Sequence, residues 1–485
     1  MASTSNRFLK EANLIGGAWV QADSGQSFDV IDPATGGRIG RVPDAGAAET
    51  RRAIEAAHAA FADFRKTSAA HRAGLMRRLY GLIVENQEAL AELLTLEQGK
   101  PLAEARGEVG MSAAYILWYA EEGRRIYGET IPSSWADRRM MVIKEPVGVV
   151  AAITPWNFPS SMLARKIGPA LATGCTVVVK PAEATPFSGL AWGMLAQEAG
   201  IPDGVVNIVT GQPVAIGGEL MANPLVRKIT FTGSTRVGKI LLRQAADTVK
   251  KVSMELGGNA PFIVFDDADL DRAVEGAMAA KYRNAGQTCV CTNRFYVQSG
   301  IHDAFVERLT AASARLKVGS GFEDGVVQGP IINEMQAGKV EELVADAVAK
   351  GGRVTTGGKR HALGGTFFEP TVIADAHADM RIAREEVFGP VAPVFRFDTE
   401  QEAVEAANAT EYGLACYFYT RDLGRTYRVM EGLKYGLVGV NEGMITAVEA
   451  PFGGVKESGL GKEGGRQGIE EYLDSKYVCI GGLGF

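Results

Sequence analysis

Apolar residues recur at helical spacing in the first part of the chain. Residues 47–65 and 71–100 place them three or four positions apart, which is the period of one face of an amphipathic helix. A short β-rich stretch precedes these segments, and residues 138–148 follow them with the composition of a strand. We predict a helical layer here, flanked by short strands.

The pattern then changes to short, β-branched apolar runs that alternate with helical segments such as residues 160–172 and 234–249. The runs begin near residues 147, 174, 204, 227 and 250. This alternation indicates a parallel sheet covered by helices on both faces. A second α/β stretch follows over residues 259–446. Residues 476–485 resemble a strand that needs an edge to pair with, so we expect a homodimer or homotetramer.

Composition and length narrow the class of protein. The chain has 485 residues, more than a single hydrophobic core usually serves, so we expect two large lobes and smaller pieces. A hydrophobic fraction of 46% with 22% charged residues is typical of a soluble globular protein. The net charge of -6 argues against nucleic acid or an anionic membrane surface as the main partner.

The sequence carries no clear targeting signal. Its start lacks the apolar core of a secretory signal, and no apolar run approaches the ~18 residues of a membrane span. The five cysteines are sparse and odd in number, unlike an extracellular disulfide framework. The start is also too short and ambiguous to support a mitochondrial transit peptide. We therefore predict a cytoplasmic location.

Polar residues fall where the strands of the first sheet end, which is where parallel sheets bind ligands. Lys180 ends one apolar run and could donate to ribose hydroxyls, while the Glu183 carboxylate would accept from a ribose 2′-OH and repel a 2′-phosphate. Gly233, Ser234 and Gly238 form a strand-to-helix turn suited to a phosphate. A solvated lysine and an ordinary helix cap are the alternatives. Their places at adjacent strand ends favour a cofactor site.

A second glycine pattern is weaker. The sequence GLGKEG at residues 459–464 matches G-x-G-x-x-G, but a dinucleotide fingerprint needs a strand before it, a helix after it and an acidic residue ~20 positions later. Because the surroundings do not provide these, we predict a loop.

Cys289 and Cys291 stand one residue apart in NAGQTCVCTNR. Zinc sites usually use C-x₂₋₄-C with a second ligand pair, and the five histidines supply none, so a metal site is disfavoured. Two small buried thiols or an activated nucleophile remain open. A free thiol with a pKa of about 8.5 is mostly protonated at neutral pH, so a nucleophile needs help. Glu255 could act as base, and Asn157 could donate to a developing oxyanion.

Together these stretches resemble the aldehyde dehydrogenase superfamily, from Ile15 to Gly482. The motifs in order are TPWNFP, VVVKPAEATP, FTGSTRVG, MELGGNAP, NAGQTCVCTNR, EEVFGPV and PFGGVKESGLG. The resemblance implies an α/β fold with a Rossmann-like cofactor domain, an α/β catalytic domain and a small oligomerisation β-arm. The implied boundaries are 1–128 with 147–257 for the cofactor domain, 258–447 for the catalytic domain, and 129–146 with 468–485 for the arm.

The resemblance also implies roles for matching residues. Cys289 is then the nucleophile, Glu255 the general base, and Asn157 an oxyanion donor beside the Cys289 backbone N–H. Attack on an aldehyde gives a thiohemiacetal, hydride transfer leaves a thioester, and water hydrolyses it. Retention of all three residues argues against a non-catalytic protein on this scaffold. The expected cofactor is NAD, with NADP as the alternative. The implied cofactor contacts are Pro155, Trp156, Lys180, Glu183, Gly233, Ser234, Gly238 and Glu386.

Two stretches, RNAGQTCVC and EEYLDSKYVCIGGL, resemble the succinate-semialdehyde dehydrogenase branch. That likeness makes Arg165 and Arg283 a clamp for the substrate carboxylate, since a guanidinium binds a carboxylate with two parallel hydrogen bonds. Structural ion pairs are the alternative for both arginines. Thr446 stands where the branch usually has a serine, which leaves glutarate semialdehyde or another aldehyde as a rival substrate.

The same branch implies a redox role for Cys291, because some members share the C-x-C sequence. Cysteines bridge when their Cα atoms lie ~4.4–6.8 Å apart, and residues two apart in an extended strand sit near the upper end of that range. We expect oxidation to join Cys289 to Cys291 and to block the nucleophile reversibly.

Overall fold

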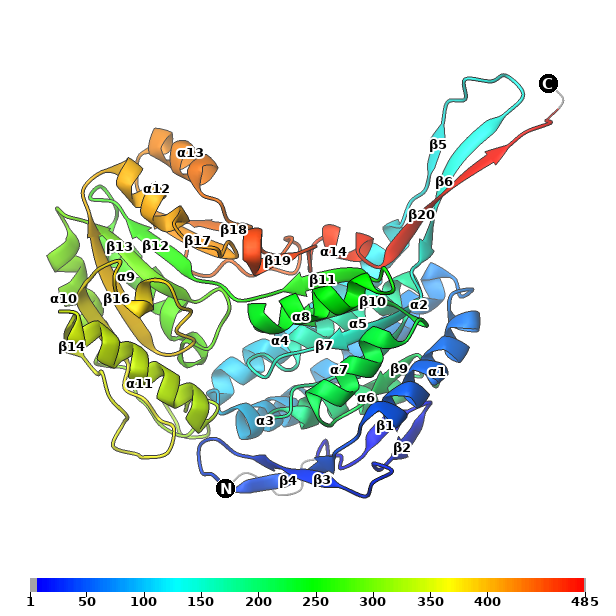
Figure 1. Ribbon diagram of the computed structural model, residues 1–485, viewed down its shortest axis with the longest axis horizontal. Coiled ribbons are helices and arrows are strands. Elements are labelled where there is room, and N and C mark those ends of the chain that lie inside the picture. Colours follow the sequence, from blue (N-terminus) through cyan, green and yellow to red (C-terminus); the bar gives the residue numbers. More distant parts are fainter. Residues whose placement is uncertain (1–6, 484–485) are drawn as a thin grey trace.

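The computed structural model describes residues 7–483, arranged as two α/β lobes and a projecting arm (Figure 1). The outer ends of two predicted domains, residues 1–6 and 484–485, lie outside the described part. The predicted fold class is confirmed: each lobe is built on its own mainly parallel sheet, and a separate three-stranded sheet forms the arm.

The first lobe contains an eight-stranded sheet in the order β19-β11-β10-β7-β8-β9-β1-β2. Its five central strands are parallel, and antiparallel strands close both edges. The strands are β1 (Asn13–Ile15), β2 (Ala18–Val20), β7 (Val149–Ile153), β8 (Thr176–Lys180), β9 (Val206–Ile208), β10 (Val226–Thr232), β11 (Lys251–Glu255) and β19 (Gly459–Leu460). Strands β3 (Ser27–Ile31) and β4 (Arg38–Pro43) form a separate ribbon.

Alternating side chains along the central strands explain why this sheet is buried on both faces. Val177 and Val179 of β8 join one apolar cluster, and Val178 joins the other. Every residue of β8 is buried, which is the reason for its continuous apolar run. The covering helices are α1 (Ala47–Phe64), α2 (Ala69–Glu85), α3 (Gln87–Gln98), α4 (Leu102–Glu122), α5 (Ser161–Thr173), α6 (Pro186–Glu198), α7 (Pro213–Ala222) and α8 (Thr235–Ala246), with the short η1 (Gly123–Arg125).

The second lobe repeats this plan with a seven-stranded sheet in the order β14-β15-β16-β13-β12-β17-β18. Within this sheet, β14 is the only strand that runs antiparallel to its neighbour, β15. The strands are β12 (Ala260–Val264), β13 (Thr292–Gln298), β14 (Arg353–Thr356), β15 (Thr371–Ala376), β16 (Val391–Phe397), β17 (Ala415–Tyr419) and β18 (Leu437–Val440). The helices are α9 (Leu270–Tyr282), η2 (Arg283–Gly286), α10 (His302–Ser313), α11 (Glu334–Ala349), η3 (Arg381–Ala383), α12 (Glu400–Asn408) and α13 (Leu423–Gly432).

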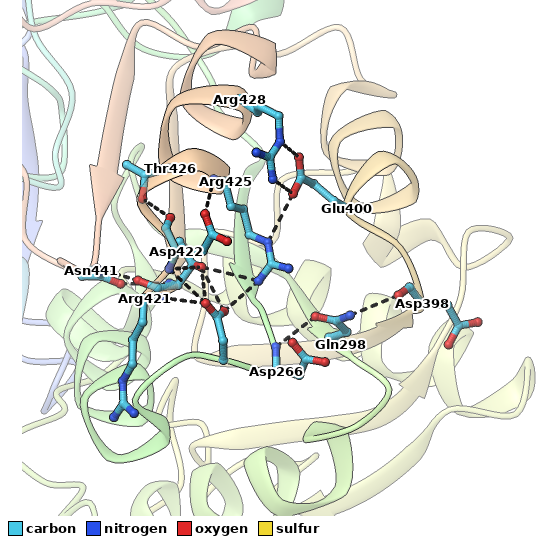
Figure 2. A network of polar contacts seen from close by, with 12 residues as sticks. Asp266, Gln298, Asp398, Glu400, Arg421, Asp422, Arg425, Thr426, Arg428 and Asn441 are labelled. Atoms are coloured by element: carbon cyan, nitrogen blue, oxygen red, sulfur yellow. Dashed lines mark hydrogen bonds and ion pairs between the residues drawn. The ribbon is translucent and has the colours of Figure 1, made fainter.

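A polar network fixes α12 and α13 to this sheet (Figure 2). Arg425 of α13 lies 2.8 Å from a carboxylate oxygen of Asp267, just beyond β12, and 3.2 Å from Glu400 of α12. Asp267 also accepts hydrogen bonds from the Thr420 hydroxyl and from the backbone N–H groups of Arg421 and Asp422. One carboxylate thus anchors the loop that starts α13.

The arm is an antiparallel sheet of β20 (Leu473–Ile480), β6 (Arg139–Pro146) and β5 (Glu129–Ile131), and it projects away from both lobes (Figure 1). It exposes large apolar side chains, among them Trp135 and Tyr477, and Tyr127 just before β5 is also exposed. The short helices η4 (Lys456–Ser458) and α14 (Gln467–Glu470) lie in the segment that leads to β20. Within residues 7–483, no helix is both long and apolar enough to cross a membrane.

The GLGKEG segment differs in part from its prediction. Gly459 and Leu460 form the short strand β19, which pairs with Glu255 and Met254 at the end of β11. The remaining residues form the predicted loop. The strand arises because the backbone of this segment satisfies the open edge of β11, a long-range contact that local spacing does not reveal.

Candidate active site

Two cavities meet at Cys289. The first has a volume of about 220 Å³ and is lined by residues of both lobes. The second has a volume of about 310 Å³. Cys289 and Met162 line both cavities, so the thiol stands where the two spaces join. A molecule in each cavity could therefore reach the same sulfur atom.

The backbone around Cys289 forms a turn. The backbone N–H of Cys291 donates to the carbonyl of Thr288 at 2.9 Å, and β13 begins only at Thr292. The expectation of an extended strand between the two cysteines is therefore wrong. Asn284 and Ala285, which precede this turn, have positive φ angles. Residues two apart in a turn lie closer together than in a strand, so the turn does not itself prevent a bridge.

Both thiols are free and differ in exposure. Cys289 is partly exposed, whereas Cys291 is buried with its Sγ 3.4 Å from the carbonyl of Lys281. Burial raises the pKa of Cys289 to about 12, although the nearby Arg165 guanidinium acts in the opposite direction. The thiol is therefore protonated at neutral pH and must lose its proton to act as a nucleophile.

Asn157 follows β7 and lines the first cavity with Cys289. Its side-chain nitrogen Nδ2 donates to the carbonyl of Gln287 at 3.0 Å, and its Oδ1 accepts from the backbone N–H of Phe158 at 3.1 Å. A primary amide has two N–H groups. One N–H of Asn157 therefore remains for an oxyanion formed at the thiol.

Glu255 ends β11 and is buried, and neither carboxylate oxygen has a hydrogen-bond partner within the described chain. Burial raises the pKa of Glu255 well above its ordinary value, and the nearby Glu463 carboxylate raises it further. Glu463 in turn forms an ion pair with Lys166, whose ammonium also donates to Thr232 at 2.7 Å. Glu255 lines neither cavity, but its unpartnered, basic carboxylate is suited to accept a proton.

The first cavity contains five of the predicted cofactor contacts: Pro155, Trp156, Gly233, Ser234 and Glu386. Ser234 caps α8 by accepting from the backbone N–H of Val237, so it is a helix cap as well as part of the cavity wall. An Oε1 of Glu386 accepts from the Gly258 N–H at 3.1 Å, and burial raises the pKa of Glu386 to about 7.

The other three predicted contacts do not line this cavity. Lys180 is buried and forms an ion pair with Glu183, whose side chain is 43% exposed. Gly238 lies within α8, where a Cβ atom would come 2.4 Å from Leu256. A larger residue there would require the Leu256 side chain to move. Sequence reasoning also missed part of the cavity wall, namely Met162, Thr232, Leu256, Gly257, Gln336, Lys339 and Phe388.

The second cavity contains Arg165, Arg283 and Thr446. Arg165 is buried, and its Nε and Nη1 atoms have no hydrogen-bond partner among the described residues. Its Nη1 forms a loose ion pair with Glu463 at 4.0 Å, which is too long for a hydrogen bond but agrees with the alternative of a structural ion pair. A buried guanidinium that lines a cavity and has few hydrogen-bond partners is suited to an anionic group.

Several residues of this second cavity have no signal in the sequence motifs. Glu104 and Glu108 stand four apart on α4, a spacing that places both on one helix face. That spacing alone could not show that the face points to Cys289. The other unpredicted residues of its wall are Gly107, Met111, Phe158, Ser161, Met162, Thr288, Val290, Met444 and Phe452. Within residues 7–483, no group of three or more His, Cys, Asp or Glu side chains is placed to hold a metal ion.

Comparison with known proteins identifies the family. Residues 19–478 match the model of the aldehyde dehydrogenase family. A 3-sulfolactaldehyde dehydrogenase of Pseudomonas putida is 60% identical over 98% of each chain. A glutarate-semialdehyde dehydrogenase of Pseudomonas aeruginosa is 58% identical over 98% of this chain and 100% of its own. An NADP⁺ succinate-semialdehyde dehydrogenase of Escherichia coli is 57% identical over 98% of this chain and 99% of its own.

Solved structures agree with this result. The crystal structure of an Escherichia coli NADP-dependent enzyme superposes with a TM-score of 0.98 at 56% identity, covering 98% of this chain and 99% of the other. Similarity of this extent covers both lobes and the arm. The chain therefore belongs to the aldehyde dehydrogenase family, whose members are oxidoreductases that use NAD(P).

Proposed function

We propose that this aldehyde dehydrogenase oxidises a short aldehyde with an anionic group at its far end, and that succinate semialdehyde is its substrate. The observation that carries this proposal is Arg165, whose buried guanidinium lines the cavity that adjoins Cys289 and has two nitrogen atoms without a hydrogen-bond partner in the described part of the chain. Arg283 lines the same cavity. Two guanidinium groups there would neutralise and orient a carboxylate while the aldehyde carbon reaches the sulfur.

In the proposed reaction, the Cys289 thiol loses its proton to water, and the thiolate attacks the aldehyde carbon to form the thiohemiacetal oxyanion. The free N–H of Asn157 and the backbone N–H of Cys289 hold its oxyanion. After oxidation to the thioester, Glu255 takes a proton from water, and the resulting hydroxide attacks the acyl carbon and releases the acid and the thiol. The raised pKa of Glu255 makes its ionised form a stronger base for this step.

The first cavity fits NAD(P). The N-terminus of α8 at Ser234 presents free backbone N–H groups suited to a pyrophosphate, and the Glu386 carboxylate can accept from ribose hydroxyls. When bound, the nicotinamide accepts the hydride from the substrate carbon. We propose NAD as the preferred form, because the partly exposed Glu183 carboxylate would repel a 2′-phosphate.

Two other anionic substrates compete with succinate semialdehyde. Relatives of nearly equal identity are named for glutarate semialdehyde and for 3-sulfolactaldehyde. Thr446 lines the second cavity and carries one methyl group more than serine. A single methylene changes the binding free energy by only ~1–3 kcal/mol. The enzyme should therefore distinguish the two semialdehydes by a small margin in binding free energy.

Steady-state kcat/KM with NAD should be measured for succinate semialdehyde, glutarate semialdehyde, 3-sulfolactaldehyde and uncharged butanal. We expect the three anionic aldehydes to exceed butanal by about 100-fold or more, since each would pair with buried guanidinium groups. Succinate semialdehyde should give the highest kcat/KM of the three. Comparable rates with butanal would exclude the anion clamp, and a leading rate with another anionic aldehyde would reassign the substrate.

We also propose that the arm pairs with a second copy of the chain. Its support is the exposure of Tyr477 on the arm sheet and of Trp135 in the loop between β5 and β6. Light scattering coupled to gel filtration should give a dimer or tetramer, and a monomer would contradict this assignment.

A further inference from the structure

Asn284 and Ala285 both adopt the left-handed conformation in the loop that leads to Cys289, with φ angles of 52° and 54°. This conformation is tolerated by asparagine, but it costs alanine about 1–2 kcal/mol. A folded chain keeps such strain only where surrounding contacts hold it in place. The contacts of Asn284 must therefore be strong enough to fix both residues.

Asn284 is buried and uses most of its polar atoms. Its backbone N–H donates to Glu104 of α4 at 2.8 Å, and its carbonyl accepts from the backbone N–H and the side-chain amide of Gln287 at 3.0 and 3.1 Å. Its Nδ2 donates to the carbonyl of Asn157 at 2.9 Å and lies 3.3 Å from the carbonyl of Gln287. One side-chain amide thus joins the loop after β7 in the first lobe to the cysteine loop in the second.

The same Asn157 carbonyl is held from another direction. The ammonium of Lys100 donates to it at 2.8 Å and is paired with Glu108 within the buried interior. The second carboxylate oxygen of Glu108 accepts from the backbone N–H groups of Ser160 and Ser161 at 2.9 and 3.1 Å. The Asn157 backbone is therefore fixed to α4 by an ion pair, whereas Asn284 fixes it to the cysteine loop.

We propose that Asn284 is a positioning residue, whose side-chain amide sets the distance between the Asn157 amide nitrogen and the Cys289 sulfur. This inference rests on the proposed function, because it assumes that Asn157 stabilises an oxyanion formed at Cys289. Asn284 acts through Asn157 and does not touch the reacting atoms. A shift of about 1 Å between reacting groups can lower a rate about 100-fold, so a single lost tether would be visible in kcat.

Three variants test the role. Asn284→Gly keeps the left-handed backbone and removes the amide, and Asn284→Asp keeps the size but sets a carboxylate against two carbonyl oxygens. Ala285→Gly is the matched control, because it changes the neighbouring left-handed residue without removing a hydrogen bond. We expect kcat to fall about 10- to 100-fold in both Asn284 variants and to stay within about twofold in Ala285→Gly. KM for the aldehyde and Kd for NAD should stay within about threefold in all variants, since neither cavity loses a wall residue.

Two further readouts separate positioning from general disruption. A primary deuterium isotope effect measured with a 1-deuterated aldehyde should increase in Asn284→Gly, because steps up to hydride transfer become limiting. The rate of Cys289 alkylation by iodoacetamide should change little, because alkylation needs the thiolate but no oxyanion donor. Equal losses of alkylation and turnover would show that the cysteine loop has collapsed and would overturn the inference.

The outcomes for the two proposals are distinct. A wild-type protein that oxidises no aldehyde would refute the proposed function, whatever the variants do. An active wild type together with an Asn284→Asp variant of normal kcat would refute the positioning role alone, since the donor would then be dispensable.

Discussion

The guanidinium carbon of Arg165 lies 4.1 Å from the centre of the Phe452 ring. This contact holds the guanidinium by a cation–π interaction while its Nε and Nη1 atoms have no hydrogen-bond partner among the described residues. Replacing Arg165 by methionine keeps much of the volume but removes the charge. We expect kcat/KM for succinate semialdehyde to fall about 100-fold or more, and kcat/KM for butanal to fall only by the factor by which Cys289 alkylation slows in the same variant. Equal losses for both aldehydes would show that Arg165 serves the structure of the pocket rather than the substrate.

Glu183 should govern the choice of cofactor. Its carboxylate forms an ion pair with Lys180 but is 43% exposed, so it can face an incoming ribose. The wild type should prefer NAD, and Glu183→Gln should raise kcat/KM for NADP about tenfold, because the repulsion of a 2′-phosphate is removed. The kcat/KM of Glu183→Gln for NAD provides the internal control and should differ little from that of the wild type. A wild type that uses NADP as well as NAD would contradict this role.

The reactivity of Cys289 should increase with pH across the range from 7 to 9. Burial raises the pKa of this thiol to about 12, so the thiolate fraction grows about tenfold per pH unit without reaching a plateau. Arg165 lowers the pKa, so Arg165→Met should react more slowly at each pH. The measurement is the rate of iodoacetamide alkylation of Cys289, followed by mass spectrometry of the tryptic peptide. A plateau near pH 8 would contradict the raised pKa.

Cys291 should protect the active-site thiol from irreversible oxidation. Both thiols are free, and the turn that joins them does not itself prevent a bridge. Peroxide should inactivate the wild type, and dithiothreitol should restore most of the activity, because a disulfide is reducible and a sulfinic acid is not. In Cys291→Ala, dithiothreitol should restore little of the activity that is lost to peroxide. Irreversible loss in the wild type would argue against the switch.

Asp267 should stabilise the second lobe. Burial alone would raise the pKa of Asp267, but hydrogen bonds from Thr420 and Arg421 and the charge of Arg425 lower it. Asp267→Ala should cost roughly 2–4 kcal/mol of unfolding free energy at neutral pH, since several donors lose their acceptor. The neighbouring exposed Asp266→Ala (Figure 2) is the control and should stay within about 0.5 kcal/mol.

The stabilisation by Asp267 should also depend on pH with a defined sign. A carboxylate with a lowered pKa in the folded state stabilises the protein above its ordinary value near 3.9, and this contribution is lost as the pH falls further. The difference between wild type and Asp267→Ala in urea unfolding should therefore shrink below about pH 4. A constant difference would show that the carboxyl group contributes through packing and not through its charge.

The sheets could be predicted from the sequence because each central strand faces two apolar cores. Val177, Val178 and Val179 alternate between those cores, and the resulting continuous run of β-branched residues distinguishes a strand from a helix. The placement of Lys180 and Glu255 at strand ends follows directly from that assignment.

Contacts between distant segments could not be predicted in the same way. Glu104 and Asn284 are separated by 180 residues, and only the packing of α4 against the loop that carries Asn284 brings them together. The left-handed conformation of Ala285 contradicts its own preference and is imposed by its surroundings. The strand β13 begins only after Cys291, so an extended strand was the wrong expectation at Cys289.

The short strand β19 places a late segment of the chain against the catalytic base proposed here. Gly459 pairs with Glu255, and Glu463 beyond it binds Lys166 on α5. During protein synthesis, a ribosome must therefore have released residues through Glu463 before the environment of Glu255 can form. Prematurely terminated chains that carry an intact Cys289 would lack this environment, so a truncated product would hold a thiol without the means to complete a turnover.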